Sequence, residues 1–173
     1  MDKGTFTTLL LGKDLRTLGQ NRIVVQTVRD QRNFDELFSL IFHHERSLVM
    51  RAVDAIEKIT SRHPEFLAPH KLQLLSVLRS ADHKELKWHL AQLVTRIDLT
   101  AAELKDVWQM LAYWALNKNE SKIVRVNALQ GLFELSKVDP GLKSDFEKVI
   151  SAMEHEMIPS IQARIRKLRS TKT

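Results

Sequence analysis

The chain has 173 residues, with no cysteine, five glycines, four prolines and a formal net charge of +6. This length suits one domain with a real core, and the small number of glycines and prolines disfavours an all-β fold. The absence of cysteine excludes disulfides and thiolate metal sites and fits a reducing compartment. No apolar run approaches the roughly 18 residues that a membrane-spanning helix needs. We therefore expect a cytoplasmic protein without a membrane segment.

Positive charge gathers at the C-terminal end of the chain. The last eleven residues carry five cations and no acidic residue, so the rest of the chain has a formal charge of +1. Such a segment can attract nucleic acid or acidic lipid, and its candidate phosphate contacts for nucleic acid are Arg164, Arg166, Lys167 and Arg169. The alternative interpretation is a solvated helix end, where cations suit the helix dipole.

The first 32 residues are expected to form capping helices. A first helix over Thr5–Leu18 would end at Gly19, because glycine favours the position just past a helix C-terminus. Asn21 is a candidate N-cap for a second helix, and Asn33 for a third that begins with Phe34.

One apolar pattern then occurs three times at a spacing of 38 residues. The segment Leu48–Ile59 carries apolar residues at positions i, i+4, i+7, i+8 and i+11, which is one face of a helix. The three matching sets are Leu48, Ala52, Ala55, Ile56 and Ile59; Leu86, Leu90, Leu93, Val94 and Ile97; and Val124, Ala128, Gly131, Leu132 and Leu135. A fixed period of this length is typical of stacked helical repeats.

The helix before each of these segments repeats with the same period. The corresponding apolar positions are Phe34, Leu37 and Leu40; Leu72, Leu75 and Leu78; and Met110, Tyr113 and Leu116. Each repeat is therefore predicted to be a pair, with an A helix followed by a B helix. Pro64 and Pro140 separate repeats because proline cannot continue a helix interior, and Thr100 is available to cap the third A helix.

Two closing helices are expected after the third repeat. The first carries the apolar face from Phe146 to Met157 and ends at or near Pro159, and the second covers Ser160–Leu168. The predicted organisation is a single domain over residues 1–169, divided into N-terminal capping helices 1–32, repeats 33–68, 69–100 and 101–140, and C-terminal capping helices 141–169. Residues 170–173 are expected to be a disordered tail.

The B-helix pattern resembles a known family. Val124-Arg125-x-x-Ala128-x-x-Gly131-Leu132, and more loosely Leu48-Val49-x-x-Ala52-x-x-Ala55-Ile56, resemble the second helix of a HEAT repeat. The resemblance implies an all-α fold, a right-handed α-α superhelix of about three HEAT-like helix pairs with terminal half-repeats. Members of this family serve as scaffolds, adaptors and transport receptors, and one small branch comprises DNA glycosylases for alkylated bases. Fold-level analogy alone does not select among these functions.

Solenoids commonly bind partners through the surface that their B helices line. Residues about half a turn from the core positions are expected to face outward and form a groove with apolar, amide and charged groups, which suits a peptide or a partner helix. The candidate partner-binding residues are Met50, Arg51, Asp54, Lys58, Trp88, His89, Gln92, Arg96, Val126, Asn127 and Gln130. Trp88 is the predicted anchor. The alternative is that Met50, Trp88 and Val126 pack against a neighbouring repeat.

No catalytic or metal-binding motif is recognisable. The seven histidines show no pair at a ligand spacing, and no nucleophile motif or phosphate-binding glycine loop occurs. We therefore predict a non-catalytic scaffold or adaptor that binds a protein or peptide partner, with no cofactor and no metal. The alternative is a nucleic-acid-binding protein related to alkylated-base DNA glycosylases, in which Asp54 and Trp88 would face the base. The near-neutral body of the chain opposes it.

Overall fold

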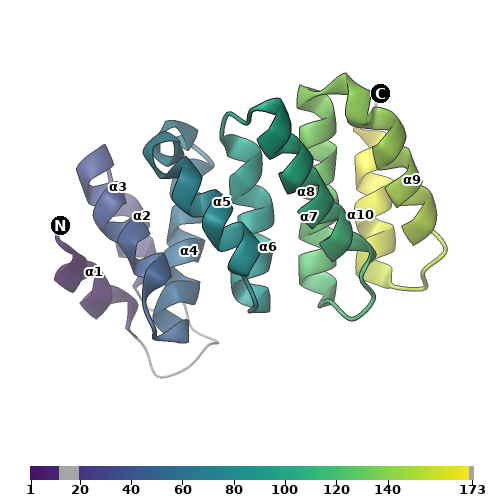
Figure 1. Ribbon diagram of the computed structural model, residues 1–173. Helices are drawn as coiled ribbons and strands as arrows, with labels where there is room; N and C mark the ends of the chain where they lie inside the picture. The colour runs from purple at the N-terminus through teal and green to yellow at the C-terminus, as the bar shows by residue number, and fades with distance from the viewer. Residues whose placement is uncertain (12–19, 172–173) are drawn as a thin grey trace. The chain divides into compact units, whose positions relative to one another are not determined.

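The structure is a computed structural model, which describes residues 1–11 and 20–171 (Figure 1). All regular secondary structure in these residues is helical, and no strand occurs among them, which confirms the predicted all-α fold. The chain divides into two compact units, Met1–Lys71 and Leu72–Thr173. The division lies close to residues 68 and 69, where the first predicted repeat gives way to the second.

The first unit is built around the first predicted B helix, α4. Its elements are α1 (Lys3–Leu10), α2 (Asn21–Thr27), α3 (Gln31–Phe38), the 3-10 helix η1 (Ser39–Phe42), α4 (Arg46–Thr60) and the 3-10 helix η2 (Pro64–His70). Helix α4 contacts α1, α2, α3 and both 3-10 helices. Its Leu48, Ala52 and Ile56 side chains are fully buried, so the predicted apolar face forms the centre of this unit's core.

Two of the predicted caps in this unit are wrong. Helix α3 is capped by Asp30, whose carboxylate accepts a 2.8 Å hydrogen bond from the backbone N–H of Asn33, the residue that we expected to be the cap. Asn21 is instead the first residue of α2, where it is buried and donates a 2.9 Å bond from Nδ2 to the Arg51 carbonyl. The side-chain amide of Asn21 therefore forms a long-range hydrogen bond and does not cap α2. The first helix ends at Leu10 and Leu11 is extended, so the expected continuous helix over Thr5–Leu18 is wrong. Gly19 lies outside the described residues.

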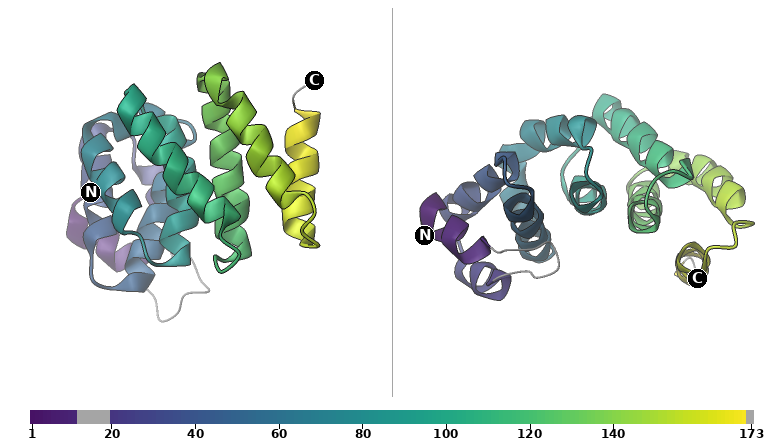
Figure 2. Two further views of the ribbon diagram at one scale, coloured as in Figure 1. Left: turned by 45° about the vertical axis from the view of Figure 1, so that its right-hand side comes forward. Right: turned by 90° about the horizontal axis from the view of Figure 1, so that it is seen from below.

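The second unit consists of two layers of helices. Its elements are α5 (Lys71–Ser80), α6 (Lys84–Leu93), the 3-10 helix η3 (Val94–Arg96), α7 (Ala101–Leu116), α8 (Lys122–Val138), the 3-10 helix η4 (Pro140–Leu142), α9 (Lys143–Met153) and α10 (Pro159–Ser170). Figure 2 shows α5, α7 and α9 in one layer and α6, α8 and α10 in the other. Helix α8 is central, because it contacts α6, α7, α9 and α10. The layers therefore correspond to the predicted A and B helices.

The repeated B-helix face is buried with two exceptions. Thirteen of the fifteen predicted positions are buried, and the other two, Leu86 and Ile97, are half-buried. Both belong to the middle copy, in which α6 ends at Leu93 and a 3-10 turn replaces its last part. Ile97 lies beyond the regular helix, so the expectation of a full-length second B helix is wrong.

The A-helix pattern repeats in sequence but not in burial. Phe34, Leu37 and Leu40 of the first copy are fully buried. In the later copies, Leu72 is 77% exposed and Tyr113 is 61% exposed. The expectation that both helices of every pair repeat the same packing therefore holds only for the B helix.

Gly131 allows α8 to approach α6 and α7 closely. A Cβ atom at this position would lie 2.6 Å from the Ala91 carbonyl oxygen of α6 and 2.8 Å from Cδ1 of Leu111 on α7. Carbon atoms do not approach other atoms this closely in folded proteins, so any side chain here would force the helices apart. The small residue in the HEAT-like pattern is thus a packing requirement.

Two successive B helices in this unit carry a cation at equivalent positions. Lys87 of α6 pairs with Glu120 in the turn between α7 and α8, and both side chains are 14% exposed. Arg125 of α8, 38 residues further on, forms two parallel bonds with Glu156 in the loop between α9 and α10, at 2.8 and 2.6 Å. Arg125 Nε also donates to the Ala115 carbonyl at 2.8 Å. Each B helix is therefore joined to the loop that follows the next A helix.

The C-terminal helix α10 begins at Pro159 and extends to Ser170, one residue past the predicted end of the domain. Proline is well placed at a first helical position, where its missing N–H needs no partner. Ile161, Ile165 and Leu168 are buried, as the predicted apolar stripe requires. Residues 172 and 173 of the expected tail lie outside the described part of the chain.

Thr100 caps α7 through a reciprocal pair of bonds with Glu103, as the sequence predicted for the cap itself. Its Oγ1 accepts from the Glu103 N–H at 3.3 Å, and the Glu103 carboxylate accepts from the Thr100 N–H at 2.7 Å. We expect Thr100→Ala to lower the free energy of unfolding by about 1 kcal/mol, measured by urea denaturation. Ser144→Ala, at an exposed position of α9, is the control and should change it by less than about 0.5 kcal/mol. Equal effects of the two changes would contradict the capping role.

Candidate partner-binding surface

A groove lies between the two B helices α6 and α8 of the second unit. Its volume is about 410 Å³. The residues that line it are Ala91, Gln92, Thr95, Arg96, Gln130, Gly131, Glu134, Lys137 and Val138. The base of the groove follows from packing, because Gly131 brings α8 against the Ala91 backbone. We call this feature the B groove.

The α8 wall of the B groove is a connected line of polar side chains. Gln130 Nε2 donates to Glu134 Oε1 at 2.6 Å, and Lys137 Nζ lies 2.6 Å from Glu134 Oε2. Arg164 Nη1, from α10, donates to Gln130 Oε1. Gln130 thus has both halves of its amide engaged, which fixes its orientation at the centre of the wall.

Arg164 is a half-buried cation at the edge of this line. Burial lowers the pKa of its guanidinium, because removal from water disfavours the charged form. Its hydrogen-bond partner is an amide oxygen, and no carboxylate pairs with it among the described residues. The dehydration of this charge is therefore only partly compensated within the protein.

Three of the predicted partner-binding residues line the B groove. These are Gln92, Arg96 and Gln130, which the 38-residue register had placed on the same surface. Trp88, the predicted anchor, is half-buried one helical turn before Gln92, and its ring stacks on His89 with centroids 3.4 Å apart. Asn127 is also half-buried, and its Nδ2 donates to the Ile123 carbonyl of its own helix.

Five other predicted residues are not exposed, which corrects the expected surface. Met50, Arg51, Asp54, His89 and Val126 are all buried. Four of them lie on α4 or α8, which are each surrounded by several helices, so positions half a turn from one packed face contact another neighbour. Arg51 illustrates this, since its Nη1 donates to the Leu10 carbonyl of α1 at 2.9 Å. His89 lies on α6, where its Nδ1 is 2.6 Å from the Glu85 carbonyl oxygen. Lys58 remains exposed and pairs with Asp54.

The basic residues of α10 do not form one uniform surface. Arg169 pairs with Glu154, while Arg166 and Lys167 are exposed. Arg164 faces α8, as described above. Two of the four predicted phosphate contacts are therefore engaged with other side chains.

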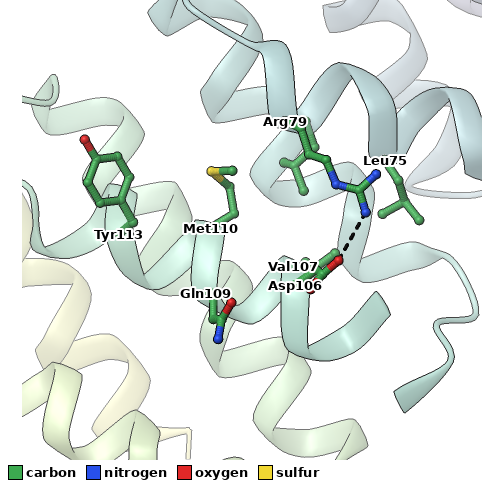
Figure 3. Close-up of a pocket in the computed structure, with 8 residues that line it drawn as sticks. Leu75, Arg79, Asp106, Val107, Gln109, Met110 and Tyr113 are labelled. Atoms are coloured by element: carbon green, nitrogen blue, oxygen red, sulfur yellow. Dashed lines mark hydrogen bonds and ion pairs between the residues drawn. The ribbon is translucent and has the colours of Figure 1, made fainter. Parts of the chain in front are cut away.

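A second hollow, which no sequence pattern predicted, lies between the A helices α5 and α7 (Figure 3). Its volume is about 460 Å³, and it is lined by Leu75, Leu78, Arg79, Asp106, Val107, Gln109, Met110 and Tyr113. Arg79 and Asp106 form a 3.2 Å ion pair across it. Its only signal in the sequence is the apolar and aromatic character of α7, because its existence depends on the separation of two helices.

The described residues contain no group of three or more side chains placed to hold a metal ion. No helix in the described part of the chain combines the length and apolar character that crossing a membrane requires. The B groove combines fixed amide and charged groups along its walls with a narrow base of small residues. This arrangement is suited to holding an extended or helical segment by hydrogen bonds and ion pairs.

Neither a curated protein nor a solved structure matches the chain. The sequence profile of the HEAT repeat domain matches residues 10–172, which is nearly the whole chain. Domains of this kind are helical repeat scaffolds that commonly serve protein interactions and are generally not catalytic. The chain therefore belongs to the HEAT repeat domain family.

Proposed function

We propose that this protein is a non-catalytic scaffold or adaptor that binds a protein partner through the B groove. The observation that carries the proposal is the position of Gln92, Arg96 and Gln130 on the walls of one groove of about 410 Å³. Family membership supports the same class of function, since HEAT repeats commonly mediate protein interactions.

The chemistry of the B groove favours a polypeptide ligand. An amide side chain has two N–H donors and two acceptor sites, so Gln92 and Gln130 keep hydrogen-bonding capacity beyond their bonds within the protein, which a backbone or a polar side chain of a partner can use. Val138, 76% exposed at one end, adds apolar contact area. Interfaces of this composition obtain specificity from polar groups and affinity from a few well-placed anchors.

The alternative function is nucleic-acid binding through α10. Arg166 and Lys167 are exposed there and would supply phosphate contacts. Glu154 pairs with Arg169 of this helix and opposes the approach of a polyanion. The protein-binding function is therefore the better supported of the two.

The groove is tested by blocking it with a bulky side chain. We expect Gln92→Trp to reduce the amount of specifically captured partner at least about tenfold, because the indole fills the space between α6 and α8. The measurement is affinity capture from a native cell extract, quantified by mass spectrometry against wild-type protein.

The matched control is Gln109→Trp, which makes the same substitution at an exposed position lining the hollow between α5 and α7. Circular dichroism establishes that both variants keep their helical content. If capture survives Gln92→Trp and is lost in Gln109→Trp, the A-helix hollow is the binding site and the B groove is not. Unchanged capture in both variants would remove the basis of the proposal.

A further inference from the structure

We infer that the B groove recognises a carboxylate-bearing segment of its protein partner, with Arg164 as the group that pairs with the carboxylate. This inference rests on the proposed function, and it names the chemistry of the partner. Its basis is the geometry of the α8–α10 junction and the balance of charge along the groove.

Arg164 is positioned but not neutralised. Its bond to Gln130 Oε1 uses Nη1, and a guanidinium has five N–H donors in a rigid planar arrangement. Gln130 is itself fixed by its bond to Glu134, so the guanidinium is held against the groove wall before any ligand arrives. A positioned guanidinium is the preferred partner for the two oxygens of a carboxylate.

Charge along the groove favours an acidic ligand. Lys137 and Glu134 line the groove, and Arg164 contacts the lining residue Gln130 from α10, so these three side chains carry two positive charges and one negative charge. Glu134 is already matched by Lys137 at 2.6 Å. A carboxylate of the ligand would form an ion pair with Arg164 and offset the dehydration cost of this half-buried guanidinium.

The same arrangement disfavours a continuous polyanion. Glu134 lies on the groove wall beside Gln130, so a ligand with one charge at every step would meet a fixed negative group. A polypeptide can place one or two carboxylates at Arg164 and leave uncharged side chains opposite Glu134. The ligand class is therefore an acidic peptide segment with spaced charges, and a nucleic acid backbone fits less well.

The inference is tested with labelled peptides and full-length protein. Fluorescence anisotropy is measured with a peptide of alternating glutamate and leucine, a matched peptide of glutamine and leucine, and a DNA duplex. We expect the glutamate peptide to bind more tightly than the glutamine peptide. Arg164→Met, which keeps the length of the side chain but removes its charge, should weaken glutamate-peptide binding about tenfold.

Arg166→Met is the matched control, because Arg166 is an exposed cation two residues away on the same helix. It should leave binding of the glutamate peptide within about twofold of wild type. Thermal unfolding shows whether Arg164→Met keeps the fold. If it does not, Lys137→Met, at a second and exposed position, replaces it as the test and should weaken binding of the glutamate peptide. Equal losses in Arg164→Met and Arg166→Met would show a diffuse attraction and overturn the inference.

The two proposals fail in distinguishable ways. If neither glutamate nor glutamine peptide binds, but Gln92→Trp still abolishes capture from the extract, the acidic-ligand inference is wrong and the B groove remains the binding site. If only the DNA duplex binds, and its affinity falls steeply with salt, both proposals give way to nucleic-acid binding.

Discussion

Replacing Glu156 with alanine is expected to lower the free energy of unfolding by about 3 kcal/mol at neutral pH. The reason is the burial of its partner, because the Arg125 side chain is 2% exposed and both of its Nη atoms bond to Glu156. Removal of the carboxylate leaves a guanidinium in the interior, where its Nε still donates to the Ala115 carbonyl at 2.8 Å. Urea denaturation of the variant and the wild type measures the difference.

Two further variants distinguish the contribution of the buried ion pair to stability from that of an exposed charge. Glu154→Ala removes a more exposed carboxylate in the same loop and should cost less than about 1 kcal/mol. The double variant Arg125→Met with Glu156→Ala should be more stable than Glu156→Ala alone, because it no longer buries an unmatched charge. A double variant less stable than the single one would contradict this account.

The same pair predicts how stability depends on pH. Hydrogen bonds from Arg125 are the largest cause that lowers the pKa of Glu156 below its ordinary value of 4.5. A carboxylate with a lowered pKa in the folded state stabilises the protein fully above its unfolded pKa. That stabilisation is lost as the pH falls below about 4.5 and through the lower pKa of the folded state. The difference in the free energy of unfolding between wild type and Glu156→Ala should therefore become smaller at acidic pH.

Gly131→Ala is expected to destabilise the protein by about 2 kcal/mol, although alanine normally favours a helix over glycine. The added methyl group would lie 2.6 Å from a backbone oxygen of α6, which cannot rotate away as a side chain can. The gain in helix propensity, about 1 kcal/mol, only partly offsets this overlap. The midpoint of thermal unfolding, followed by circular dichroism, measures the net effect.

Gly4→Ala provides the comparison for this change. The nearest atom to a Cβ at Gly4 is a side-chain oxygen of Asp2 at 3.7 Å, an ordinary contact. This variant should be no less stable than wild type. A Gly131→Ala variant that melted at or above the wild-type temperature would mean that α6 and α8 separate without cost, and that a small residue at position 131 is not a packing requirement.

The B-helix core was predictable because it depends on one helix at a time. Periodicity places Ala52, Leu90 and Ala128 on apolar faces, and all three are fully buried. The Thr100 cap was predictable for the same reason, since its partner Glu103 is three residues away. Local spacing carries enough information for features of this kind.

Features that join distant segments were not predictable from spacing. The pairing of Arg125 with Glu156 spans 31 residues and ends in a loop, where periodicity gives no position for a side chain. The burial of Arg51 and Val126 depends on how many helices surround α4 and α8. The contact between Arg164 and Gln130 likewise needs the angle at which α10 meets α8, so the sequence identified the residues of the B groove only in part.

The paired cations on α6 and α8 have a consequence for how the second unit opens. Detachment of α9 and α10 would break the ion pair between Glu156 and Arg125. Separation of the α7–α8 turn would break the ion pair between Glu120 and Lys87. Each opening therefore breaks a largely buried ion pair in addition to exposing apolar area. We expect the helical hairpins at the C-terminal end to exchange their amide hydrogens together with their neighbours, as one cooperative block, and not to fray singly.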